Sequence, residues 1–130
     1  TARYRLAPGV RAFGVALRLL NRASCPDGGV DDRWQLFVPK DAAIRPVTND
    51  GELRLHTWRF AEGSGCRQAP IETEAFLTFD VKPRAGTWAD LVITARRSDR
   101  KRPPLVVEVP YDGRLYRLEH WRERFDRWYR

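Results

Sequence analysis

The sequence has no methionine, two cysteines, two histidines, three lysines and three serines among its 130 residues. No apolar run approaches the roughly 20 residues that a membrane-spanning helix needs. The serines lie in no nucleophile elbow, and the Cys and His residues do not have the spacing of a metal site. The glycine pairs lack the lysine of a phosphate-binding loop. We therefore expect no catalytic residue, no metal and no cofactor.

Basic residues exceed acidic ones by 24 to 17, which gives a formal net charge of +7 and a pI of about 10.1. The excess is uneven, with +4 over residues 1–30, −3 over 31–81 and +6 over 82–130. Nearly all the cations are arginines, which favour two-pronged contacts with carboxylates and phosphates. The charge indicates an acidic protein, a polyanion or an anionic membrane as partner, without selecting one of them.

Both cysteines stand in turn-like surroundings, Cys25 before Pro26 and Cys66 after Gly65. An even number of cysteines at loop positions predicts one disulfide, which would stabilise the domain by about 4 kcal/mol in the chain-entropy model. A disulfide favours a periplasmic or secreted location. The alternative is a pair of free thiols in a cytosolic protein.

The chain begins with Thr1 and lacks methionine. This indicates a processed or trimmed form, and the sequence leaves open whether a targeting segment preceded it. The sequence leaves open a lipid anchor upstream of Thr1.

Apolar residues alternate with period two along most of the chain, the pattern of half-buried strands. In the first such stretch Phe13, Val15 and Leu17 share one face, opposite a face of Ala12 and Gly14. Six stretches of this kind, separated by Gly, Pro, Asn and Asp, predict a mainly β protein. We expect antiparallel sheets in a small β-sandwich or Greek-key barrel, forming one domain over residues 1–130.

The C-terminal segment has a different period. Apolar residues recur at steps of three and four from Leu118 through Trp121 and Phe125 to Trp128. This spacing predicts an amphipathic helix over residues 118–130, with its aromatic face on the sheet and its arginines near solvent.

Two features could be read as catalytic. His56 lies on one strand face with Trp58 and Phe60, and Glu72 and Glu74 lie two residues apart at a strand entrance. A lone histidine on an aromatic face is more often a packed, hydrogen-bonded side chain, and edge carboxylates are more often solvated charges. We expect binding rather than catalysis.

The sequence therefore predicts a non-catalytic, exported protein-binding domain. An inhibitor or immunity protein that blocks a toxin, a lytic enzyme or another hydrolase fits best, because loops on a rigid scaffold lose little entropy on binding. The alternative is a polyanion-binding module that uses the basic tip at 96–102 and the Arg-rich tail. Nucleic acid is disfavoured, because the aromatic segment 53–60 lies in the acidic third of the chain.

Three charged loops are expected to contact the partner: 27–33, 49–52 and 96–102. Loops between strong strands carry binding residues more often than the strands do. The candidate partner-binding residues are Asp27, Asp31, Asp32, Arg33, Asp50, Glu52, Arg97, Arg100, Lys101 and Arg102.

Overall fold

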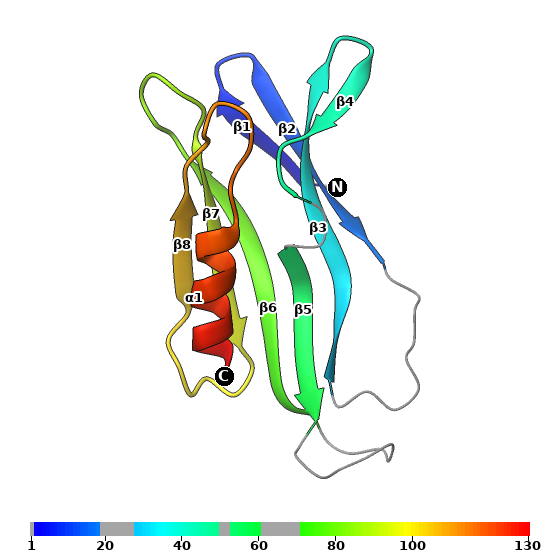
Figure 1. Ribbon diagram of the computed structural model, residues 1–130, viewed down its shortest axis with the longest axis vertical. Helices are drawn as coiled ribbons and strands as arrows, with labels where there is room; N and C mark the ends of the chain where they lie inside the picture. Colours follow the sequence, from blue (N-terminus) through cyan, green and yellow to red (C-terminus); the bar gives the residue numbers. More distant parts are fainter. Residues whose placement is uncertain (1, 19–27, 50–52, 61–70) are drawn as a thin grey trace.

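The computed structural model describes residues 2–18, 28–49, 53–60 and 71–130. Within these residues, eight strands and one helix follow one another (Figure 1). They are β1 (Ala2–Ala7), β2 (Val10–Leu17), β3 (Gly28–Lys40), β4 (Ala43–Pro46), β5 (Leu53–Phe60), β6 (Ile71–Lys82), β7 (Asp90–Arg97), β8 (Leu105–Val109) and α1 (Glu119–Tyr129).

All eight strands belong to one antiparallel sheet in the order β1-β2-β3-β5-β6-β7-β8, and β4 pairs with β3 off this path. The mainly β class with a single C-terminal helix is thus confirmed. The strand order establishes neither the expected sandwich nor the expected Greek-key barrel. Cys25 and Cys66 lie outside the described residues, so the disulfide stays a prediction.

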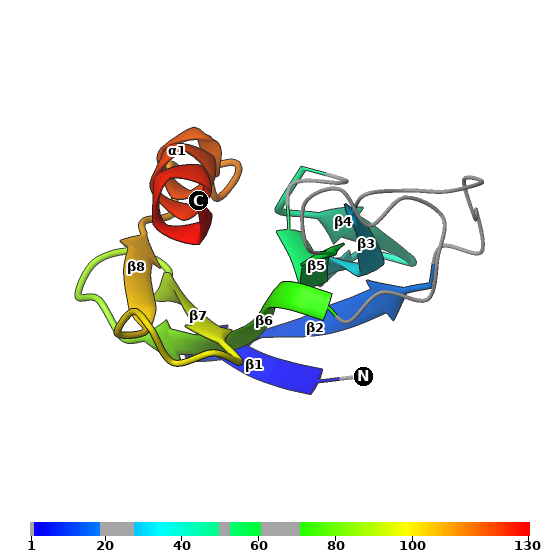
Figure 2. The ribbon, with the colours of Figure 1, turned by 90° about the horizontal axis from the view of Figure 1, so that it is seen from below.

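The sheet is strongly bent, and its concave side holds the core. Seen from below, β8 and β7 rise on one side and β3, β4 and β5 on the other, with α1 over the β7–β8 side (Figure 2). The backbone N–H of Ala89, just before β7, donates to the carbonyl of Leu6 in β1 at 2.7 Å. This bond ties the first strand to the start of the seventh.

Alternation along each strand separates an inner from an outer face. The inner face carries the buried aliphatic residues, because removing them from water is the main favourable contribution to folding. The largest fully buried side chains include Leu36, Leu53, Leu91, Ile93, Tyr116 and Trp121. The Tyr116 hydroxyl donates to the Ala89 carbonyl at 2.7 Å, so the buried phenol is satisfied.

The helix covers this core as its spacing predicts. Leu118 and Trp121 are buried, and Phe125 and Trp128 pack partly buried against the same cluster. Arg122, Arg124 and Arg127 are exposed. Within the described residues, no helix combines the length and apolarity that a membrane crossing requires.

Candidate functional site

Five residues on the outer side of the sheet form what we call the arginine–aromatic face: Arg33, Arg54, His56, Phe76 and Arg96. They belong to β3, β5, β6 and β7, and each alternates with residues that point into the core. The strand register brings them together, because Arg33 pairs with Arg54, His56 with Phe76, and Phe76 with Arg96. A single surface therefore joins Arg96, from the basic C-terminal third, to arginines and aromatic rings from the acidic middle of the chain.

The aromatic part of this face is held in place by two contacts. The His56 and Phe76 rings stack at 4.6 Å between centroids with an interplanar angle of 7°. His56 Nε2 lies 2.9 Å from Glu74 Oε2, which fixes the imidazole from its edge. Phe76 remains 45% exposed despite the stacking. An exposed phenylalanine with a fixed orientation is a suitable anchor for a partner, since little entropy is lost when it is buried.

The three arginines have few partners of their own. Arg96 donates to Thr78 Oγ1 at 3.4 Å. Among the described side chains, no carboxylate lies within ion-pair distance of Arg33, Arg54 or Arg96. Like charges directly opposite each other on neighbouring strands destabilise a sheet. Arg33 and Arg54 are therefore a like-charge pair in the strand register, and an anionic group would relieve the repulsion expected between them.

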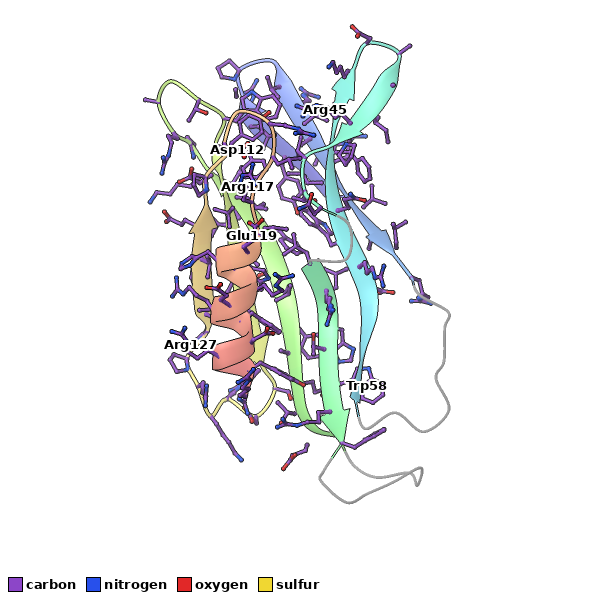
Figure 3. All side chains as sticks on the ribbon, viewed as in Figure 1. Arg45, Trp58, Asp112, Arg117, Glu119 and Arg127 are labelled. Atoms are coloured by element: carbon purple, nitrogen blue, oxygen red, sulfur yellow. The ribbon has the colours of Figure 1, made fainter. Side chains whose placement is uncertain are left out.

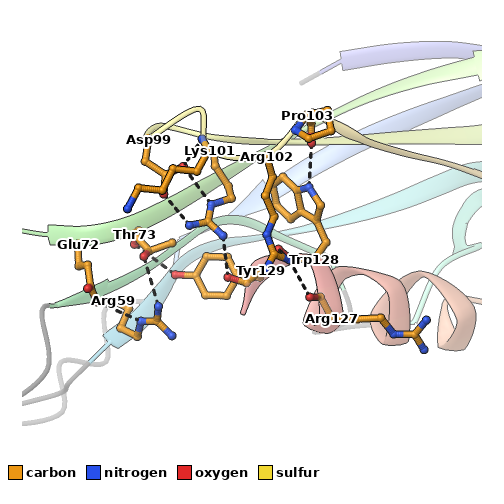
Figure 4. A network of polar contacts seen from close by, with 11 residues as sticks. Arg59, Glu72, Thr73, Asp99, Lys101, Arg102, Pro103, Arg127, Trp128 and Tyr129 are labelled. Carbon is orange, nitrogen blue, oxygen red and sulfur yellow. Dashed lines mark hydrogen bonds and ion pairs between the residues drawn. The ribbon is translucent and has the colours of Figure 1, made fainter.

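The predicted 96–102 tip has a structural role that the sequence did not indicate. The Arg97 side chain is 8% exposed, pairs with Asp99 at 2.6 Å and donates to the Tyr129 carbonyl at 3.2 Å. Arg102 donates to the carbonyls of Arg127 and Trp128 at 3.1 and 2.7 Å (Figure 4). Two of the expected partner-binding cations thus satisfy carbonyls at the C-terminal end of α1, where positive charge is favourable.

The same network anchors the helix to the sheet. The Trp128 indole N–H donates to the Pro103 carbonyl at 2.9 Å, and the Tyr129 hydroxyl donates to the Thr73 carbonyl at 3.2 Å. The hydrogen bonds from Arg97 hold the pKa of Asp99 below its usual value. Arg100 and Lys101 are exposed and keep the solvated character expected of the tip.

The remaining predicted partner residues are scattered. Asp27, Asp50 and Glu52 lie outside the described residues. Asp31 lies in β3 at the register position opposite His56. Asp32 has a positive φ of 53° and lies 3.6 Å from Arg18, and Arg33 belongs to the arginine–aromatic face. Of the predicted partner residues that the structure describes, Arg33 and, by register, Asp31 belong to that face.

The two features that could have been catalytic are engaged in local pairs. Glu72 lies 3.8 Å from Arg59, whereas Glu74 contacts His56, so the two carboxylates have different partners. Among the described residues, no group of three or more His, Cys, Asp and Glu side chains is placed to hold a metal ion.

Sequence reasoning missed Arg54, Phe76 and Arg96. Period-two alternation was a usable signal, because it puts each of these residues on the strand face opposite the buried one. The strand register, which joins them into one surface, cannot be derived from the spacing of residues in the sequence. Comparisons with protein-family models, with curated proteins and with solved structures found no match for this chain. The interpretation of the face therefore depends on its own residues.

Proposed function

We propose that this chain is a non-catalytic binding domain that docks on an acidic protein surface through the arginine–aromatic face. The observation that carries the proposal is a cluster of three arginines around an exposed, fixed Phe76, with no described carboxylate within ion-pair distance of any of the three. Arginine and aromatic residues are enriched in the centres of protein interfaces, whereas lysine is depleted. The described face has that composition.

The charge of the face supports an acidic partner. A guanidinium binds a carboxylate through two parallel hydrogen bonds, which gives orientation as well as attraction. Carboxylates that pair with Arg33 and Arg54 would also relieve the repulsion between these two side chains. Val106 on β8, which pairs with Thr94, is a further apolar residue on the outer side of the sheet and is 51% exposed.

A polyanion remains the second candidate, because the register places cations beside aromatic rings on one sheet face, as single-strand binders do. The geometry favours a protein. The His56 and Phe76 rings stack on each other, so they offer one combined stacking position rather than the successive positions that a strand of bases uses.

The finer parts of the sequence prediction stay proposals. We infer that the domain is exported, is closed by a Cys25–Cys66 disulfide, and acts as an inhibitor or immunity protein for a toxin or hydrolase. An acidic cleft rim on such an enzyme would match the arginine–aromatic face. These residues would then block the cleft without taking part in chemistry.

The test uses the oxidised full-length chain as bait on its own cell envelope, followed by titration of the captured, purified protein. We expect a stoichiometric protein partner, whose affinity falls about tenfold or more in the Arg54→Glu and Arg96→Glu variants, because each reverses a charge in the contact. The matched control is Arg124→Glu, which reverses an exposed arginine on α1 and should leave the affinity unchanged.

Two outcomes would reject the proposal. The first is recovery of nucleic acid or glycan alone, with an affinity that falls steeply with salt, which would favour the polyanion candidate. The second is a protein partner whose affinity is the same for Arg54→Glu, Arg96→Glu and the Arg124→Glu control. Circular dichroism of each variant would show that a loss of affinity does not reflect unfolding.

A further inference from the structure

A separate pocket lies at the end of the molecule where the β1–β2 and β3–β4 hairpins meet the segment before β7. Its volume is about 490 Å³, within the range of pockets that hold small molecules. Gly9 and Val10 line it from the first hairpin, and Lys40 and Arg45 from the second. Figure 3 shows Arg45 in this region, well away from Trp58 on the lower part of β5.

The pocket is cationic. Arg11, Lys40 and Arg45 line it, and no acidic residue does. Among the described side chains, no carboxylate lies within ion-pair distance of any of these three cations. Arg45 has two neutral partners, the Arg114 carbonyl at 2.9 Å and the Tyr111 hydroxyl at 3.2 Å.

The carboxylate of Asp112, the residue after Tyr111, has partners other than the three pocket cations. It accepts from the backbone N–H groups of Leu115 and Arg114 and contacts Arg117 Nε at 2.6 Å. These contacts lower the pKa of Asp112 to about 2. Its charge is therefore already compensated by Arg117, and the positive charge of the pocket is available to a ligand.

Part of the pocket lining is apolar. Phe13, Val38 and Trp88 line it, and Trp88 stacks on Tyr111 at 4.3 Å between centroids and 17° between planes. Tyr111 thus holds two pocket residues at once, since its ring supports Trp88 and its hydroxyl accepts from Arg45. Because Tyr111 contacts both Trp88 and Arg45, the aromatic ring and the cation of the pocket are pre-organised. Together they suit a ligand with a planar body and an anionic group.

We propose that this pocket binds a small phosphate monoester with a planar ring, of the nucleoside monophosphate class. Three cations from three segments suit a dianionic phosphate better than a single carboxylate, which would leave two charges unbalanced. The ring rests against the wall formed by Trp88. The site is distinct from the arginine–aromatic face, because Lys40 and Arg33 lie seven residues apart on one strand, about 23 Å.

The experiment is isothermal titration of the full-length chain with adenosine monophosphate, with adenosine and inorganic phosphate as separate probes at constant ionic strength. We expect saturable binding of the monophosphate at one site, and affinity at least about tenfold weaker for either half alone. Binding should fall about tenfold or more in Arg11→Gln and Lys40→Gln, and also in Tyr111→Phe, which keeps the stacked ring but removes the acceptor for Arg45. Lys101→Gln, at the far tip, is the matched control.

The proposal is overturned if no saturation occurs up to about 10 mM monophosphate, if phosphate alone binds as tightly, or if Lys40→Gln binds like Lys101→Gln. Arg54→Glu should retain monophosphate binding. Loss of that binding in Arg54→Glu would also overturn the proposal, since it would place the ligand on the arginine–aromatic face. Binding of the protein partner by the Arg54→Glu variant is measured separately. That measurement tests the proposed function without involving the pocket.

Discussion

Trp34 determines which residues the neighbouring strand can place on the inner face. Its indole stacks on Phe79 at 3.8 Å and meets Tyr4 edge-on at 6.0 Å. The space over Gly14 is filled by the same ring, since a Cβ built there would lie 2.5 Å from Trp34 Cζ2. Next to Trp34 the inner face of β2 therefore carries the small residues Ala12 and Gly14, and the larger Phe13 and Val15 alternate to the other face.

Replacing Gly14 by alanine should destabilise the domain by about 1–3 kcal/mol, because the indole is fixed between two other rings and cannot move aside without loss of packing. Urea denaturation of the variant measures the effect. In the double variant Gly14→Ala/Trp34→Leu the clash is absent, so we expect a smaller loss than the sum of the two single variants. Strict additivity would show that Trp34 is not the cause.

At the scale of elements, the strength of the sequence pattern decided what could be predicted. Residues 75–81 and 91–95 alternate strongly, and they lie in β6 and β7 as expected. The short strands β1 and β4 were missed, since β4 has only four residues and contains Pro46. In β2 the small residues Ala12 and Gly14 are buried and Leu17 is 46% exposed, so side-chain size near Trp34 outweighed hydrophobicity.

The candidate site was less predictable than the fold, because the site depends on pairing between strands and on contacts that are distant in the sequence. Alternation assigns a residue to a face, but the arginine–aromatic face exists only because Arg33 pairs with Arg54 and Phe76 with Arg96. The contact of Arg102 with α1 spans 26 residues in sequence. No local signal distinguishes such a cation from a solvated one at the same turn.

The C-terminal end of α1 offers a test at this scale. Arg102→Ala removes the donor to the Arg127 and Trp128 carbonyls, and we expect a loss of about 1 kcal/mol in the free energy of unfolding together with faster amide exchange in the last turn. Lys101→Ala is the matched control, because its side chain is exposed in the same tip. Equal effects of the two substitutions would mean that the capping contacts contribute nothing.

At the scale of the whole molecule, the strand order bears on the predicted Cys25–Cys66 disulfide, because it determines which strand ends lie together. Gly28, where β3 begins, pairs with Arg59 near the end of β5. The connection 18–27 leads into β3, and the connection 61–70 leads from β5 to β6. The two connections that contain Cys25 and Cys66 therefore meet the described strands at the same end of the sheet, which supports the proposed disulfide between them.

Oxidised protein should show the mass of one disulfide and a Cys25–Cys66 peptide after non-reducing digestion. Closing a loop of about 40 residues restricts the unfolded chain, so reduction, or the Cys25→Ser/Cys66→Ser variant, should lower the free energy of unfolding by about 4 kcal/mol. The pocket is lined by residues of the β1–β2 and β3–β4 hairpins, at the other end of the sheet from the strand ends that lead into these two connections. Monophosphate binding at the opposite end should therefore survive reduction at temperatures where the reduced chain is folded. Two free thiols in protein purified without reductant would contradict the disulfide and remove the main argument for export.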